Sequence, residues 1–218
     1  MMPSRKVLVD QLREQIAQVA PARPPVSRLL TRVPLLDARI GGWPRGCVSS
    51  VLGNIGSGRL GLLLPTMRHL TLENRFVALV DSLSQLHPPG LPGVRLDRLV
   101  LVRPGVHRAG WAAEQLAQSG ALSLVILLDP PQLYRSGRRL LQAAQRGDAP
   151  IVVVWEQRDG HLPDRIRLLV RDRSVHILRG DRQLGSPPLA LPDTPLPGEA
   201  RGPVATPGSP DYPPPETR

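Results

Sequence analysis

Apolar residues occur in short continuous runs through the middle of the chain, and this pattern predicts buried β-strands. The runs are separated by turn residues or by stretches with helical spacing, as is typical of strands that are covered on both faces. They predict five strands and two further short ones, at 47–52, 76–80, 99–102, 123–128, 151–154, 166–170 and 175–178.

Helical spacing of apolar residues lies between these runs. It predicts helices at 60–72, 110–119 and 138–146, the last two ending at Gly120 and Gly147. Strands that alternate with helices in this way indicate a parallel sheet flanked by helices. Ligands of such α/β folds sit beyond the carboxyl ends of the strands, where Gly53 to Arg59, Asp81 and Asp129 lie in this chain.

The pattern divides the chain into three parts. Residues 1–28 combine an amphipathic helix at 7–19 with a proline-rich linker, and residues 29–184 form the core domain. The helix either packs on its own domain or docks on a partner. From residue 185 to residue 218, prolines are frequent and large apolar residues are few, which predicts a disordered tail.

Composition narrows the class of protein. The 28 Lys and Arg residues against 18 Asp and Glu give a formal charge of +10, which attracts polyanions or acidic proteins. The single cysteine, Cys47, excludes an internal disulfide and favours a small buried core residue in a reducing cytosol. The spacing of the His residues predicts no metal site, and no apolar run is long enough to predict a membrane span or a signal peptide.

A glycine-rich loop follows the first predicted strand. It reads Gly53, Asn54, Ile55, Gly56, Ser57, Gly58, Arg59, Leu60. A phosphate-binding loop has glycines at this spacing, followed by a lysine that reaches the outer phosphates and a hydroxyl that ligates Mg²⁺. Here Arg59 holds the lysine position and Leu60 the hydroxyl position. The backbone cradle is therefore expected to survive, whereas the magnesium site is not.

The flanking segments resemble the RecA recombinase core. Upstream lies the run Leu36-Asp37-Ala38-Arg39-Ile40-Gly41-Gly42-Trp43-Pro44-Arg45-Gly46, and the segment 111–120 is similar to the helix before the Walker B strand. Asp129 then matches the metal-side aspartate at the end of that strand. The resemblance implies a RecA-like core with a mostly parallel central sheet.

The departures from RecA concern catalysis and DNA binding. RecA proteins follow their second strand with Asp-Ala-Glu, whose glutamate activates water, whereas this chain reads Asp81-Ser82-Leu83. Leucine cannot act as a general base. The segments after Asp129 and after Gln157, where RecA carries its two DNA-binding loops, are short. We therefore expect no catalytic residues, no metal and no enzymatic activity.

A RecA-like core of this length, with a degenerate phosphate loop and shortened DNA loops, resembles the ImuA family. The Gly-Gly-Trp-Pro-Arg-Gly run and the Trp-Ala-Ala-Glu-Gln segment carry this resemblance, which covers residues 29–180. It implies a cytoplasmic accessory factor of the SOS response, associated with the nucleoid on DNA damage. Such a factor acts as an adaptor in translesion synthesis with ImuB, an error-prone C-family DNA polymerase and RecA.

Other functions stay open at this point. One is a nucleotide-binding module that binds ATP without hydrolysis, or a weak ATPase in which Arg59 replaces lysine. A second is a DNA-binding module that uses the basic residues Arg135, Arg138 and Arg139, with further charge from Arg158, Arg165, Arg167, Arg171 and Arg173. Its DNA contact would be weak and salt-dependent. A third is a cell-division inhibitor similar to SulA, which shares the RecA-like descent.

Single residues at the strand ends have two interpretations each. Asp81 and Asp129 are either relics of a metal site or ordinary turn-forming aspartates. Gln157 lies near the position of a nucleotide-sensing glutamine in RecA proteins, although an exposed glutamine is the simpler interpretation. Trp43 is expected to pack against the first strand, and Trp111 in the core or an interface.

Overall fold

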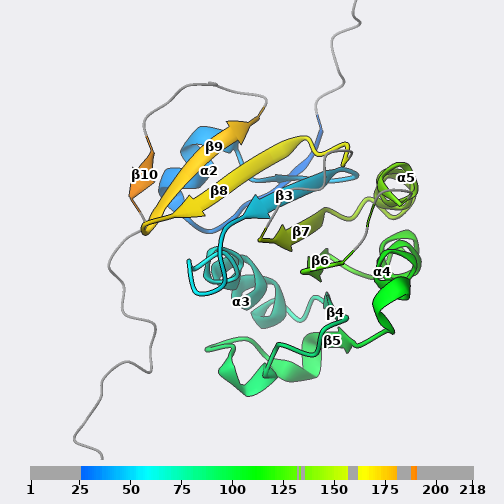
Figure 1. The fold of residues 1–218 in the computed structure, drawn as a ribbon. Coiled ribbons are helices and arrows are strands. Elements are labelled where there is room, and N and C mark those ends of the chain that lie inside the picture. Colours follow the sequence, from blue (N-terminus) through cyan, green and yellow to red (C-terminus); the bar gives the residue numbers. More distant parts are fainter. Residues whose placement is uncertain (1–25, 132, 134–135, 157–161, 181–187, 191–218) are drawn as a thin grey trace, which may run out of the picture.

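The computed structural model describes residues 26–131, 133, 136–156, 162–180 and 188–190. An eight-stranded sheet runs through the described part, in the order β10-β9-β8-β3-β7-β6-β4-β5. Helices α2 and α3 lie on one face of this sheet and α4 and α5 on the other (Figure 1). This arrangement confirms the predicted α/β fold with helices on both sides of the sheet.

Most of the sheet is parallel. β3 pairs in parallel with β7 and β8, and the ladder continues in parallel through β6 and β4 to β5. β9 and β10 are antiparallel additions at the opposite edge. The strands are β3 (Val48–Leu52), β4 (Val77–Asp81), β5 (Leu99–Val102), β6 (Leu124–Leu128), β7 (Ile151–Trp155), β8 (Ile166–Arg171), β9 (Ser174–Arg179) and β10 (Leu189–Ala190).

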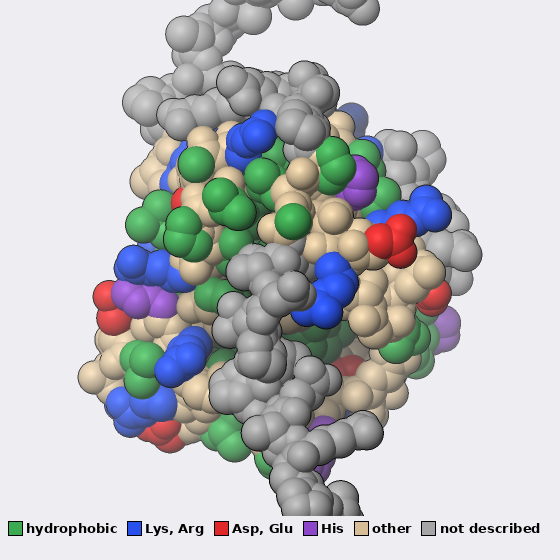
Figure 2. Space-filling model, turned by 90° about the vertical axis from the view of Figure 1, so that its left-hand side faces the viewer, with side chains coloured by type: hydrophobic (Ala, Val, Ile, Leu, Met, Phe, Trp, Pro, Cys, Tyr) green, Lys and Arg blue, Asp and Glu red, His purple; other side chains and the backbone are tan. Residues whose placement is uncertain are grey.

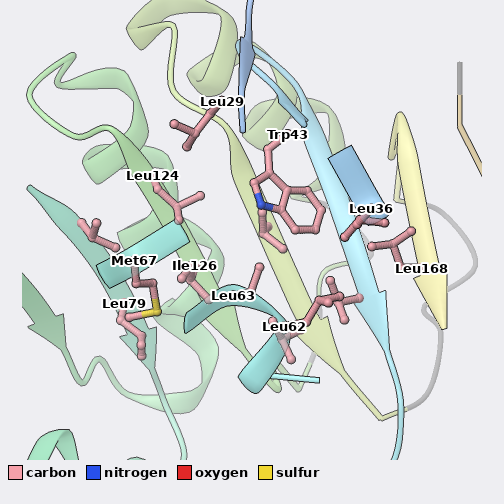
Figure 3. Packing of buried hydrophobic residues seen from close by; sticks show 14 of the residues in the cluster. Leu29, Leu36, Trp43, Leu62, Leu63, Met67, Leu79, Leu124, Ile126 and Leu168 are labelled. Carbon is pink, nitrogen blue, oxygen red and sulfur yellow. The ribbon is translucent and has the colours of Figure 1, made fainter. Parts of the chain in front are cut away.

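One half of the core lies between the sheet and helices α2 (Pro34–Ile40) and α3 (Leu64–Leu72). Trp43 is fully buried there among leucines, isoleucines and Met67 (Figure 3). Its indole Nε1 donates to Thr66 Oγ1 at 3.3 Å, and Thr66 Oγ1 donates to the Thr31 carbonyl oxygen at 2.7 Å. Trp43 was expected to pack against the first predicted strand, and it lies in one buried cluster with Val51 of that strand, β3.

The other half lies under α4 (Ala109–Gln118) and α5 (Gly137–Gly147), which pack side by side. Their backbones approach so closely that a Cβ on Gly147 would stand 1.8 Å from the Ala117 carbonyl oxygen. Glycine is therefore required at the end of α5 by the distance between the two helices.

The entry to the core contains three short elements that the sequence pattern did not predict. These are β1 (Arg28–Leu29), α2 and β2 (Trp43–Pro44), with β1 and β2 paired antiparallel. Gly41 ends α2 in the left-handed conformation. A Cβ on Gly42 would lie 2.5 Å from the Leu29 carbonyl oxygen. The double glycine therefore allows the chain to turn closely past β1.

The segments on either side of the core were predicted to be a disordered tail and a helix with a proline-rich linker. The tail from residue 185 was expected to be disordered, but Leu189 and Ala190 form β10 and pair with Val175 and Ser174. The prediction is wrong at those two residues because half-buried Leu189 packs against the core. The helix at 7–19, the linker at 21–25 and residues 191–218 lie outside the described residues. Within the described part, every helix is too short or too polar to cross a membrane.

Candidate functional site

The glycine-rich loop leaves the carboxyl end of β3, the strand between β7 and β8. Gly53 is buried at its base, where a Cβ would lie 2.6 Å from Ser57 Oγ and 2.7 Å from the Val170 carbonyl oxygen. Gly56 and Gly58 are exposed and have φ angles of +84° and +90°, which favour glycine. The loop therefore has the backbone freedom of a phosphate cradle.

The helix predicted from Leu60 begins later than expected. Residues Gly61–Leu63 form a 3-10 turn, and the α-helix starts at Leu64. Pro65 explains the delay, because proline lacks an N–H and its ring collides with the carbonyl of the residue four positions earlier. That residue is Gly61, so a continuous α-helix cannot extend back to the loop.

Arg59 is paired with Asp129 across the carboxyl end of the sheet. Its Nη1 donates to Asp129 Oδ1 at 2.8 Å and its Nη2 to Oδ2 at 2.6 Å, a bidentate ion pair. The Arg59 side chain is 8% exposed and that of Asp129 17%. Water therefore screens the pair weakly, and the planar guanidinium matches the carboxylate geometry.

The backbone holds Asp129 where Arg59 can reach it. Asp129 directly follows β6, and its N–H donates to the Val154 carbonyl oxygen of β7 at 2.8 Å. β7 lies between β3 and β6, so Arg59 spans one strand to make the pair. The φ angle of Asp129 is +38°, a left-handed conformation that aspartate tolerates better than most residues. Both expected site residues thus come together, and each neutralises the other.

Leucines hold the two positions that the resemblance to RecA assigns to the metal-binding hydroxyl and the water-activating base. Leu60 is half-buried and packs against the core, while Leu83 is exposed in the turn after β4. Neither side chain can bind a metal or accept a proton. Within the described residues, no group of three or more His, Cys, Asp or Glu side chains could hold a metal ion.

The Asp81 side chain stabilises the turn that follows β4. Its carboxylate accepts hydrogen bonds from the Gln85 N–H at 3.0 Å and the Leu86 N–H at 2.9 Å. Arg103 Nε lies 3.7 Å from Asp81 Oδ2. The side chain is 1% exposed, so its oxygens are occupied by the turn. Of the two interpretations of Asp81, the geometry favours the turn.

The proposed basic patch is brought together only in part. Arg138 and Arg139 are exposed at the start of α5, but Arg139 Nε lies 3.1 Å from Glu114 Oε1. Arg135 and Arg158 lie outside the described residues, as does Gln157. On the side of the molecule where the parallel strands end, the described basic side chains lie in small separate groups, several of them next to acidic side chains (Figure 2).

One arginine counted toward the basic charge is an internal residue. Arg167 is 9% exposed, and its Nε donates to Asp164 Oδ2 at 2.7 Å. Asp164 also accepts from Ser50 Oγ of β3, at 2.5 Å. This cluster fixes β8 against β3. A usable signal was present in the sequence, since Asp164 and Arg167 are only three residues apart.

Cys47 also differs from its prediction. It was expected to be a buried core residue, but it precedes β3 and is only half-buried. Arg165 Nη1 lies 3.9 Å from its sulfur. The strand begins one residue later than predicted, at Val48, after a turn in which Gly46 has a φ angle of +62°.

Comparison with known proteins gives two kinds of likeness. In sequence, the chain is 35% identical to RecA of Acholeplasma laidlawii over 91 residues, which is 40% of this chain and 28% of that protein. It is 32% identical to RecA of Bacillus licheniformis over 97 residues, again 28% of that protein. The chain thus spans just over a quarter of the length of these curated relatives. No family model matches it.

In structure, the chain resembles the RadB recombinase. The two superpose with a TM-score of 0.59 at 20% sequence identity, over 72% of this chain and 93% of the RadB chain. This likeness concerns the fold. Together, the comparisons and the sheet topology confirm a RecA-like core and a relationship to RecA over two fifths of the chain.

Proposed function

We propose that this protein is a non-catalytic RecA-like accessory factor of DNA-damage-induced mutagenesis. The observation that supports this proposal most strongly is the ion pair between Arg59 and Asp129. In an active phosphate loop, the cation at the first position would face phosphate and the aspartate at the second would face the metal. Here the two charged side chains form an ion pair with each other instead.

Hydrolysis of ATP requires three groups at separate positions. A cation must hold the outer phosphates, a hydroxyl must hold Mg²⁺ and a base must orient the attacking water. Arg59 is neutralised by Asp129, while Leu60 and Leu83 lack any polar side-chain atom. A single substitution could be compensated, but three losses at three roles argue against turnover.

The partners follow from the resemblance to the ImuA family. A RecA-like core without ATP chemistry retains a rigid sheet and two helix-covered faces, which can support protein docking. We infer that it links ImuB and an error-prone C-family DNA polymerase, with RecA as a further partner. Its place of action would be the cytoplasm, at the nucleoid after DNA damage. The sequence relationship to RecA supports a role in DNA repair.

A second candidate is a nucleotide-binding module that does not hydrolyse ATP. The left-handed glycines Gly56 and Gly58 favour it, because their conformations are those of a backbone cradle. In that case nucleotide would regulate the binding of partners. The candidates therefore differ in whether ATP changes partner affinity.

The test is a pull-down of purified ImuB and, separately, RecA by the purified chain, with and without ATP and Mg²⁺. The adaptor role predicts capture of at least one of them, unchanged by ATP and unchanged in a Gly58→Asp variant. Washing at two salt concentrations controls for non-specific attraction by the basic chain. Capture that requires ATP and is lost in Gly58→Asp supports the second candidate. Failure to capture either protein contradicts the adaptor role.

A further inference from the structure

A surface patch at the start of α4 combines an aromatic side chain with positive charge. We call it the Trp111 surface and define it by Val106, His107, Arg108, Trp111 and Arg139. Trp111 is 54% exposed, and Val106, five residues earlier in the chain, is also exposed. Trp43 and Trp155, the other two tryptophans of the chain, are buried. Leaving a tryptophan in water loses its large apolar contribution, so this exception needs an explanation.

Helix geometry determines which side chains lie next to Trp111. Arg108 precedes Trp111 by three residues and Glu114 follows it by three, so both lie next to it on the helix surface. Arg139 of α5 reaches Glu114, with its Nε 3.1 Å from Glu114 Oε1, and so lies near the helix turn that carries Trp111.

A hollow lies at the N-terminal end of this helix. It has a volume of about 260 Å³ and is lined by Gly105, Val106, His107 and Arg108. The lining residues lead into α4 and precede Trp111 by three to six residues. This volume is large enough for one apolar side chain.

Positive charge predominates on the Trp111 surface. Its basic side chains are those of exposed Arg108 and of Arg139, and its one carboxylate, Glu114, is paired with Arg139. Glu114 is 8% exposed and lies under Arg139, so it presents little negative charge to solvent. A ligand that complements this surface is therefore acidic and carries an apolar group for the hollow.

We propose that the Trp111 surface binds an acidic peptide segment of a partner protein that bears one or two large apolar side chains. Tryptophan and arginine are the residues most enriched at energetically dominant interface positions, and arginine binds carboxylates in a bidentate geometry. Single-stranded nucleic acid fits less well, because it is bound along successive aromatic platforms. Trp111 is the one aromatic residue of α4 and α5.

This surface lies outside the nucleotide site, and only the identity of its partner rests on the proposed function. Its test uses synthetic probes, so its failure and a failure of the ImuB and RecA pull-down are separate results. The probe is a fluorescein-labelled dodecapeptide of Asp, Glu and Ser with a central Leu-Phe pair. A second dodecapeptide replaces Leu-Phe with Ser-Ser, and a 12-residue oligo-dT serves as the nucleic acid.

Binding is measured by anisotropy, and acrylamide quenching of tryptophan emission reports the site directly. Because only Trp111 among the three tryptophans is exposed, an unlabelled Leu-Phe peptide bound here protects the quenchable fraction. We expect Trp111→Ala to weaken the Leu-Phe peptide at least tenfold and Arg108→Gln to weaken it about fivefold. Arg138→Gln is the matched control, an exposed arginine of α5 that is not part of the Trp111 surface, and is expected to change affinity less than twofold.

Folding is controlled by circular dichroism and by Trp111→Phe, which keeps a flat ring and is expected to retain most of the affinity. Three results would overturn the proposal. One is equal affinity of the wild type and Trp111→Ala for the Leu-Phe peptide. Another is absence of peptide binding and of quenching protection. The third is binding of oligo-dT that depends on Trp111 while peptide binding does not, which would identify a nucleic-acid site.

Discussion

The guanidinium of Arg59 donates two hydrogen bonds, of 2.8 and 2.6 Å, to the carboxylate of Asp129, which lies 70 residues further along the chain. Under the proposed function, this pair occupies the place where a nucleotide-binding RecA-like protein would bring phosphate and metal together. A nucleotide must therefore compete with an internal carboxylate for Arg59. The pair explains how the loop keeps the glycine pattern of a phosphate cradle and still lacks a free cation.

Removing the carboxylate is expected to release Arg59. In Asp129→Asn, the guanidinium keeps one acceptor but loses its counter-charge, so the affinity for inorganic pyrophosphate should rise at least tenfold. Loss of this weakly solvated pair should also lower the free energy of unfolding by about 2 kcal/mol. Isothermal titration calorimetry and urea denaturation measure the two effects.

The control for this prediction removes both charges. The double variant Arg59→Gln, Asp129→Asn keeps the loop glycines and has no cation, so its pyrophosphate affinity should stay at the wild-type level. If Asp129→Asn also binds no more tightly than the wild type, the ion pair does not block the cradle.

Asp81 is expected to contribute to stability rather than to metal binding. In Asp81→Ala, the N–H groups of Gln85 and Leu86 lose their acceptor, the buried Asp81 carboxylate, which should cost about 2 kcal/mol. Asp81→Asn keeps one of the two oxygens and should lose roughly half as much. Urea denaturation measures both. A melting temperature of the wild type that rises with Mg²⁺ and loses that rise in Asp81→Asn would favour the metal-site interpretation instead.

Glu114 gives the protein a pH dependence of known sign. Burial raises the pKa of the Glu114 carboxyl above its usual value of 4.5, and the nearby Arg139 offsets part of this rise. The folded state then holds this proton more tightly than the unfolded state. The Glu114 carboxyl therefore lowers the free energy of unfolding as the pH rises from 4.5 through its pKa in the folded state.

Replacing Glu114 with glutamine removes this dependence. The stability of Glu114→Gln relative to the wild type should increase between pH 4 and pH 7, as measured by urea denaturation at a series of pH values. Glu156→Gln, which removes an exposed carboxylate, controls for the loss of one negative charge. A stability difference for Glu114→Gln that falls as the pH rises would show that the pairing with Arg139 outweighs burial.

The close approach of α4 and α5 makes Gly147 irreplaceable. An alanine there would place its Cβ 1.8 Å from the Ala117 carbonyl oxygen, so the two helices would have to separate. Gly147→Ala should lose about 3 kcal/mol or fail to fold. Gly61→Ala is the matched control, because nothing lies within 4 Å of its Cβ. Thermal unfolding compares the two, and equal melting temperatures would contradict the geometry.

The strands of the core could be predicted because burial on both faces leaves an unmistakable apolar run. The predicted strand 123–128 matches Leu124–Leu128, in which every residue is buried. The same reasoning fails for β1, β2 and β10, since a two-residue strand is too short to show any period. Helix α2 has only seven residues, although Gly41 at its end was a visible stop signal.

The site was predictable in position but not in its internal pairing. The spacing of Gly53 and Gly58 located the loop, and the end of a strand located Asp129. That Arg59 turns to Asp129 depends on β7 lying between β3 and β6, a strand order that sequence periodicity does not give. Arg167 was counted as a surface charge for the same reason, because its burial follows from the position of β8 beside β3.

The most direct test of the account is steady-state ATP hydrolysis by the purified chain with Mg²⁺, with and without single-stranded DNA. Gly58→Asp is measured in parallel as the background, and an active RecA protein serves as the positive control. A non-catalytic core with Arg59 paired to Asp129 predicts turnover no higher than that of Gly58→Asp. Magnesium-dependent turnover by the wild type that is abolished in Gly58→Asp would contradict it.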